Sequence, residues 1–142
     1  MVAIGAVASM IAMSGCGGPA APAAACVEIK TDCQPLYEPP TYPTLYDKIF
    51  KPTCASGMGT CHTADAKMGG LFFQDPAQAY QLLLGKTDGR ARIVPSNPGC
   101  SLLAEKVAST DPLFRMPPGN GLSAAELCDV MQWLGAGAGE SP

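Results

Sequence analysis

The chain has 142 residues, which is enough for one domain with extensions. Its formal charge is −3, and its nine Lys and Arg residues are scattered, which argues against binding to nucleic acid, because that needs clustered basic residues. Seven cysteines in so short a chain are consistent with an oxidising compartment.

Residues 1–15 are expected to form a signal peptide. Residues 2–13 are mostly apolar but are too few to span a bilayer as a helix, which takes ~20 residues. Small residues then lead into Cys16, a pattern that resembles the lipobox of bacterial lipoproteins. The resemblance implies cleavage before Cys16, lipidation of Cys16, and export to the cell envelope, where the lipid anchors the chain to a membrane on its periplasmic or cell-surface face.

Residues 16–44 are predicted to form a disordered tether. This stretch holds six prolines and few large apolar residues, so it buries too little surface to offset the entropy of ordering. Cys26 and Cys33 lie within it, close enough in sequence to pair with each other. We therefore expect a local Cys26–Cys33 disulfide without a chemical role.

Residues 45–138 are predicted to fold as a small all-α domain of four or so short helices with long loops. Apolar residues at helical spacing precede Cys54 and indicate the first helix. Asp75 and Pro76 suit the start of a second helix, which Gly85 ends.

The third helix is expected over residues 100–108, and the fourth begins at Ser123, which forms a capping box with a Glu three residues later. Trp133, in the fourth helix, is expected to pack at a helix interface. A Cys100–Cys128 disulfide would join these two helices and stabilise a thin core by roughly 3–4 kcal/mol.

Four residues suggest a site for a haem iron. His62 is the only histidine in the chain and directly follows Cys61, and Met116 is followed by two prolines. An imidazole and a thioether can hold haem iron from its two sides, while cysteines attach the porphyrin covalently. Cys54 is the second candidate for attachment, although it lies seven positions before Cys61 instead of three.

From Tyr46 to Ala138 the chain resembles small class I c-type cytochrome domains, in particular those of exported bacterial lipoproteins. The matching pieces occur in the order of that family: an amphipathic helix, Cys61-His62, Gly69-Gly70-Leu71, a helix, Val94-Pro95, Met116-Pro117-Pro118, Leu122-Ser123 and Trp133-Leu134-Gly135.

The resemblance implies a monohaem protein with covalently attached haem c. His62 would be the proximal and Met116 the distal iron ligand, Cys61 and Cys54 would form thioethers, and Pro95 would help to orient His62. It further implies a carrier that relays single electrons to a redox protein partner and is not an enzyme.

The spacing of Cys54 and Cys61 leaves three outcomes open: attachment through both cysteines, attachment through Cys61 alone, or a Cys54–Cys61 disulfide without haem. The last outcome corresponds to a second function, a haem-free, disulfide-stapled lipoprotein that acts as a binding or structural module. A further alternative is a soft copper site formed by His62 with Met58 and Met68.

Lys86, Arg90 and Arg92 form the only basic cluster. They are expected to lie in a solvated loop or, as an alternative, to face an acidic partner or the haem propionates.

Overall fold

The computed structural model describes residues 26–56 and 60–141. Within them the elements occur in the order α1 (Tyr42–Leu45), η1 (Tyr46–Cys54), η2 (Thr60–His62), η3 (Met68–Gly70), α2 (Pro76–Leu83), β1 (Lys86–Thr87), β2 (Arg90–Ala91), η4 (Pro98–Cys100), α3 (Leu102–Ala108) and α4 (Ala124–Gly135). The domain is mostly helical, as predicted. None of the helices in these ranges is long and apolar enough to cross a bilayer. The expected signal peptide and Cys16 lie outside the described residues.

The starts of α2 and α4 confirm the capping residues predicted from the sequence. Asp75 Oδ1 accepts a hydrogen bond from the backbone N–H of Gln78 at 2.8 Å, and Pro76 occupies the first turn of α2. In α4, Ser123 Oγ accepts from the Glu126 N–H at 3.3 Å, and Glu126 Oε2 accepts from the Ser123 N–H at 2.8 Å. Each cap satisfies backbone donors that have no partner inside the helix.

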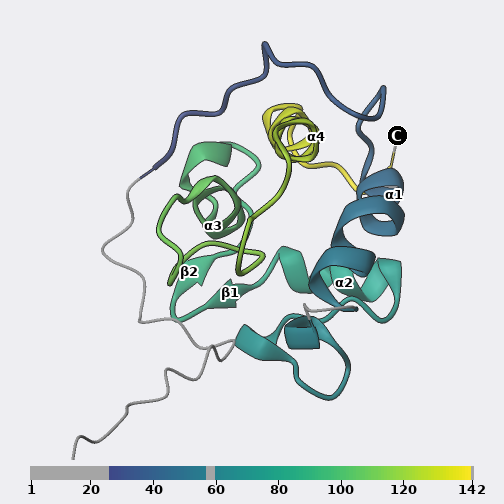
Figure 1. Cartoon of the computed structure of the whole chain (residues 1–142). Helices are drawn as coiled ribbons and strands as arrows, with labels where there is room; N and C mark the ends of the chain where they lie inside the picture. The colour runs from purple at the N-terminus through teal and green to yellow at the C-terminus, as the bar shows by residue number, and fades with distance from the viewer. Residues whose placement is uncertain (1–25, 57–59, 142) are drawn as a thin grey trace, which may run out of the picture.

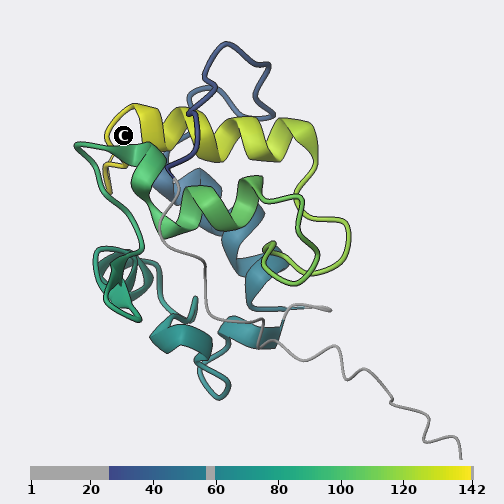
Figure 2. The ribbon, with the colours of Figure 1, turned by 90° about the vertical axis from the view of Figure 1, so that its left-hand side faces the viewer.

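The core forms where α1 and its continuation η1 pack against α4, which also lies beside α3 (Figures 1 and 2). Trp133 of α4 is only 3% exposed and lies 5.8 Å from the Tyr42 ring and 6.0 Å from the Phe50 ring, measured between centroids. Its indole N–H donates to the Gly139 carbonyl at 2.9 Å. Trp133 therefore packs at a helix interface, as the sequence predicts.

A two-stranded antiparallel pair, β1 with β2, was not predicted. Asp88 and Gly89 connect the strands with φ angles of 50° and 78°. Two consecutive positive φ angles define the tight turn that Asp-Gly sequences favour in hairpins. This short hairpin carries Thr87 and Arg92 to the edge of the pocket described below.

The disulfide pairing expected from the sequence is wrong. Cys26 pairs with Cys100, and Cys33 pairs with Cys128. Proximity in the sequence would favour Cys26 with Cys33, because a short loop costs less entropy to close. Packing of residues 26–41 over the domain decides otherwise, since it carries Cys26 to the end of η4 and Cys33 to the middle of α4.

Residues 26–41, which we call the N-terminal strap, contain no helix or strand but do not form a free tether. The strap runs over α3 and α4 before it enters α1 (Figure 1). Besides the two disulfides, Gln132 Nε2 donates to the Thr31 and Cys33 carbonyls at 3.1 Å each. The expected disorder of residues 16–44 is therefore wrong for the strap, because cross-links and hydrogen bonds replace the missing apolar contacts.

Asp129 of α4 holds the strap from the inside of the domain. It is fully buried, and its Oδ1 accepts from the backbone N–H groups of Leu36 and Tyr37 at 3.1 and 3.0 Å. Its Oδ2 has no hydrogen-bond partner among the described residues. Desolvation raises the pKa of Asp129 above its ordinary value, although the two hydrogen bonds act in the opposite direction.

We expect Asp129 to give the domain a pH-dependent stability. Because the pKa of Asp129 is higher in the folded than in the unfolded state, protonation of Asp129 stabilises the fold. This contribution to the free energy of unfolding is fully present below about pH 4 and is lost as the pH rises through the folded pKa. Asp129→Asn, which keeps an acceptor oxygen but carries no charge, should flatten this dependence. Asp129→Ala should lower the free energy of unfolding by about 1–3 kcal/mol at every pH, because the Leu36 and Tyr37 donors lose their acceptor. Urea unfolding at several pH values from 4 to 7 measures the free energy of unfolding of both variants. If the slope of this free energy against pH is the same in Asp129→Asn as in the parent protein, Asp129 is not the source of the pH dependence.

Candidate functional site

The orientation of His62 is fixed by a backbone carbonyl. His62 ends the short helix η2, and its Nδ1 lies 3.0 Å from the carbonyl oxygen of Leu71, just after η3. Since a carbonyl can only accept, Nδ1 carries the hydrogen and Nε2 keeps its lone pair. The ring also meets Phe73 edge to face, with 6.0 Å between centroids. The histidine is thus arranged as metal-binding histidines are, with one nitrogen bonded and the other available.

The surroundings of His62 favour its neutral form. Burial lowers the pKa of the imidazole most strongly, and the nearby charges of Arg92 and Lys106 lower it further, whereas hydrogen bonds to the backbone at Leu71 and Met68 raise it. The net result is a pKa below the ordinary value, so at neutral pH the side chain can donate an electron pair to a metal.

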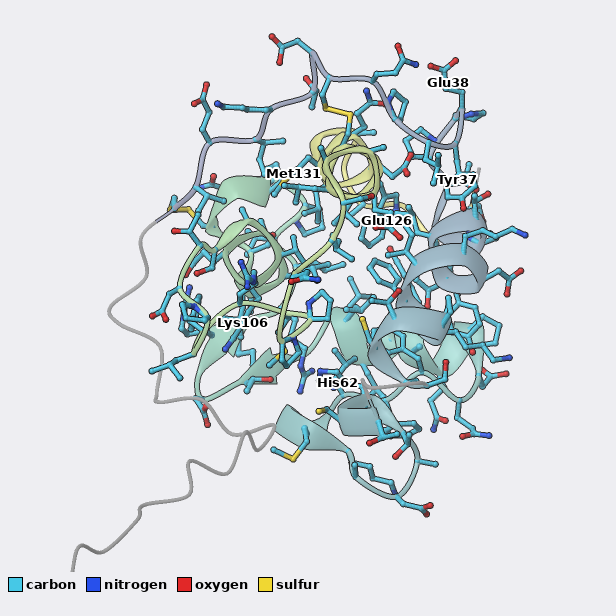
Figure 3. All side chains as sticks on the ribbon, viewed as in Figure 1. Tyr37, Glu38, His62, Lys106, Glu126 and Met131 are labelled. Carbon is cyan, nitrogen blue, oxygen red and sulfur yellow. A yellow bond between two sulfur atoms is a disulfide. The ribbon has the colours of Figure 1, made fainter. Side chains whose placement is uncertain are left out.

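Met116 is held by α3. Its backbone N–H donates to the Lys106 carbonyl at 2.9 Å, and the Lys106 ammonium lies 3.9 Å from the centroid of the Phe114 ring. Pro117 and Pro118 follow and limit the conformations of the loop. Lys106 and His62 project from different parts of the domain (Figure 3), and both line the pocket that Met116 borders.

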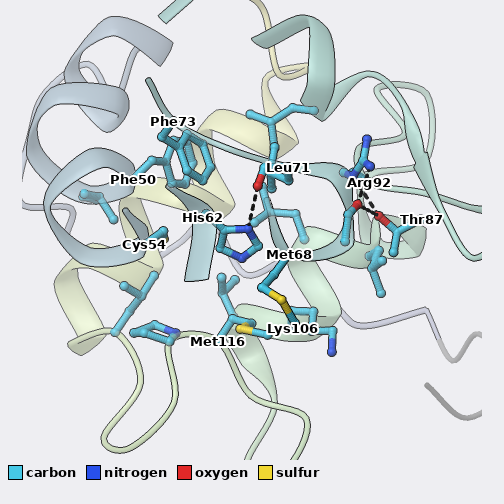
Figure 4. A pocket seen from close by; sticks show the side chains of 18 of the residues that line it. Phe50, Cys54, His62, Met68, Leu71, Phe73, Thr87, Arg92, Lys106 and Met116 are labelled. Atoms are coloured by element: carbon cyan, nitrogen blue, oxygen red, sulfur yellow. Dashed lines mark hydrogen bonds between the residues drawn. The ribbon is translucent and has the colours of Figure 1, made fainter. Parts of the chain in front are cut away.

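A single pocket of about 250 Å³ brings His62, Met116 and Cys54 together. Figure 4 shows the His62 ring and the side chains of Met68 and Met116 turned toward the same space, next to the rings of Phe50 and Phe73. The rest of the lining is largely apolar and comes from η1, the residue after η3, α2, α3 and the loop before α4: Ile49, Leu71, Leu83, Leu102, Leu103, Val107 and Leu122. The structure therefore joins residues that lie more than fifty positions apart into one apolar site.

Cys54 is a free thiol in this site. A small adjoining pocket is lined by Cys54, Cys61, His62 and Met116 together with neighbouring loop residues. Burial raises the pKa of Cys54 to about 12, so the thiol stays protonated at neutral pH. Because Cys54 is free, the structure does not contain the Cys54–Cys61 disulfide that was one of the three open outcomes. Cys61 is 4% exposed and is disulfide-bonded.

The basic cluster of Lys86, Arg90 and Arg92 does not lie in a solvated loop as a unit. Lys86 is exposed, but Arg90 forms an ion pair with the buried Glu105 of α3. Arg92 is only 8% exposed and lines the pocket, as Lys106 does. Two cationic side chains thus border an apolar cavity, which suits a ligand with an apolar body and anionic groups.

Three features of the site differ from what the sequence predicts. The carbonyl that orients His62 belongs to Leu71, whereas Pro95 is exposed and does not line the pocket. Lys106 gave no signal of its own, because it lies in an ordinary helix. Met68 shares the pocket with His62, while Met58, the other member of the copper alternative, lies outside the described residues.

One comparison with known proteins gives a match. A family model described as Planctomycete cytochrome C matches residues 59–120. The matched range contains Cys61, His62 and Met116 and excludes Cys54 and α4. A search of the curated proteins and a search of the solved structures each found no match. The family match supports a cytochrome c-like domain in this chain.

The residues of the pocket fit the prosthetic group that such a domain implies. A haem c needs an apolar cleft, two axial ligands, a thiol beside the proximal histidine and compensation for its carboxylates. The site offers apolar walls, His62 with Nε2 available, the thioether of Met116, the free thiol of Cys54, and the cations Arg92 and Lys106. These residues therefore fit a haem with an apolar body, two iron ligands and anionic carboxylates.

Proposed function

We propose that this protein is a monohaem c-type cytochrome that relays single electrons. The observation that carries the proposal is the convergence of His62 and Met116 on one apolar pocket, with the Leu71 carbonyl holding Nδ1 of the histidine. The match to the cytochrome family over residues 59–120 supports the same conclusion.

The haem would supply a metal that changes its charge by one electron. His62 would hold it through Nε2, and the hydrogen bond from Nδ1 to the Leu71 carbonyl makes the imidazole a better donor. Met116 would contribute a neutral, soft sulfur that favours the reduced metal. Two protein ligands would leave no position for a substrate, so we infer an electron carrier and not an enzyme.

Covalent attachment is proposed through Cys54 and Cys61. Cys54 carries a free thiol at the wall of the pocket, and Cys61 lies beside His62 in the adjoining cavity. A thioether at Cys61 takes the place of the disulfide that this sulfur makes, so attachment has to precede oxidation of Cys61.

We propose that the protein is anchored at the cell envelope and exchanges electrons with a redox protein there. Removal of residues 1–15 and lipidation of Cys16 would anchor the domain at the cell envelope on its exported side. The N-terminal strap, which follows the anchor in the sequence, is joined to η4 and α4 by its two disulfides. We propose that electrons pass between the haem and a redox protein in the same compartment.

Absorbance tests the proposal. The full chain, expressed with a haem-attachment system and purified from the envelope, should show a Soret band and a reduced α band that persist after denaturation. Cys54→Ser and Cys61→Ser should each leave a protein with one thioether, which the α-band position and the intact mass report. A colourless protein whose mass contains no haem would contradict the proposal and would favour the haem-free binding module.

A further inference from the structure

The turn that orients His62 has an unusual backbone. Residues 67–71 pass through three left-handed conformations, at Lys67 with φ 45°, Gly69 with φ 63° and Gly70 with φ 70°. Lys67 pays a steric cost in this conformation, because its side chain crowds the backbone. Within the turn, the Gly70 N–H donates to the Lys67 carbonyl at 2.8 Å, and the Leu71 N–H donates to the Met68 carbonyl at 3.3 Å. A turn of this kind keeps one geometry only when its surroundings support it.

Two side chains from the hairpin supply this support. Both donate to the same acceptor, the carbonyl oxygen of Gly69: Arg92 Nη2 at 2.7 Å and Thr87 Oγ1 at 2.9 Å. Arg92 Nε also donates to Thr87 Oγ1 at 2.8 Å, so the hydroxyl links the guanidinium to the turn. A Cβ atom added to Gly70 would come within 3.3 Å of Arg92 Nη2, which shows how closely the turn lies against the arginine.

Arg92 is itself rigidly placed. Its backbone N–H donates to the Gly85 carbonyl, and its own carbonyl accepts from the Leu103 N–H, both at 3.0 Å. Its Nη1 donates to the Leu82 carbonyl at the end of α2. The guanidinium therefore connects α2, the hairpin and the η3 turn, and the start of α3 holds its backbone. Its planar fork can bond three partners in fixed directions, whereas an ammonium group cannot.

We propose that Arg92 and Thr87 are positioning residues for the His62 ligand. By holding the Gly69 carbonyl, they fix the turn so that the Leu71 carbonyl stays 3.0 Å from Nδ1 of the imidazole and Nε2 faces the pocket. The role of His62 as an iron ligand rests on the proposed function, but the effect of Arg92 and Thr87 on the imidazole tautomer does not require haem.

The experiment reads the tautomer of His62 in the full chain without haem. Because His62 is the only histidine, its ring nitrogens are identified directly in a ¹⁵N NMR spectrum correlated with the ring protons. Arg92→Lys keeps the positive charge and removes the fork, and Thr87→Val removes only the hydroxyl. We expect the Nδ1–H tautomer to predominate in the parent protein. Its population should fall by roughly twofold or more in both variants, because the proton of a solvated imidazole is not confined to one nitrogen.

Arg90→Lys is the matched control. It makes the same substitution two residues earlier, at the start of β2, where Arg90 pairs with Glu105 of α3 instead of bonding the Gly69 carbonyl. Unchanged tautomer signals in this control, with altered signals in the other two variants, would support the proposal. An unchanged tautomer in Arg92→Lys and Thr87→Val would overturn it, and so would an equal change in all three variants.

If Arg92→Lys fails to fold, as circular dichroism would show, Thr87→Val alone decides the outcome. Because the measurement needs no haem, a colourless protein would refute the proposed cytochrome function and leave this test unaffected.

Discussion

Met116→Leu is expected to lower the reduction potential of the haem-loaded protein by on the order of 100 mV or more, within the ~0.8 V range that axial ligands set. The side chain keeps its bulk, so the pocket stays filled, but the metal loses a soft sulfur donor that favours the reduced state. Protein-film voltammetry or a spectroscopic redox titration measures the change.

Met68→Leu is the matched control for Met116→Leu, because Met68 is the other thioether that lines the same pocket. Its replacement should leave the potential close to that of the parent protein. If Met68→Leu lowers the potential and Met116→Leu does not, then Met68 is the ligand and the proposed axial pair is wrong.

His62→Ala completes this test. The chain has no second histidine that could replace the ligand. The variant should accumulate at least tenfold less haem-containing protein than the parent, because the imidazole directs the metal into the pocket. Haem content per polypeptide, measured after denaturation in pyridine, reports the loss, and undiminished content would remove His62 from the ligand set.

Replacing both Cys33 and Cys128 by serine is expected to lower the free energy of unfolding by about 3–5 kcal/mol. The bridge joins residues 95 positions apart, and so it removes many conformations from the unfolded chain. It also holds the strap over α4, where Asp129 and Gln132 bind the backbone of the strap. Since domains of this size have only about 5–15 kcal/mol of stability, one bridge carries a large share. Urea unfolding at constant pH measures the loss.

The same variant also tests the pairing. In the structure Cys26 is bonded to Cys100, so this bridge should remain intact when Cys33 and Cys128 are replaced. Both should therefore resist alkylation before reduction. If instead Cys26 and Cys100 become reactive, the bridges run between sequence neighbours, as first expected from the sequence.

The local features of the fold were readable from the sequence because they depend on short-range interactions. The caps at Asp75 and Ser123 satisfy backbone donors within three residues, and the apolar stripe of α4 needs only helical spacing. The hairpin between β1 and β2 was not predicted, because its strands are too short to show alternation; Asp88-Gly89 was its one local signal.

The sequence also singled out His62, Cys61, Cys54 and Met116, because a lone Cys-His pair and a Met-Pro-Pro segment are unusual in so short a chain. What it could not determine is which distant groups meet. The Leu71 carbonyl orients His62 in place of Pro95, Arg92 lies buried beside the pocket instead of in solvent, and the cysteines pair across the domain. The physical reason is that side-chain chemistry is encoded residue by residue, whereas the partners of carbonyls, guanidinium groups and thiols depend on how the strap, the hairpin and the helices pack together.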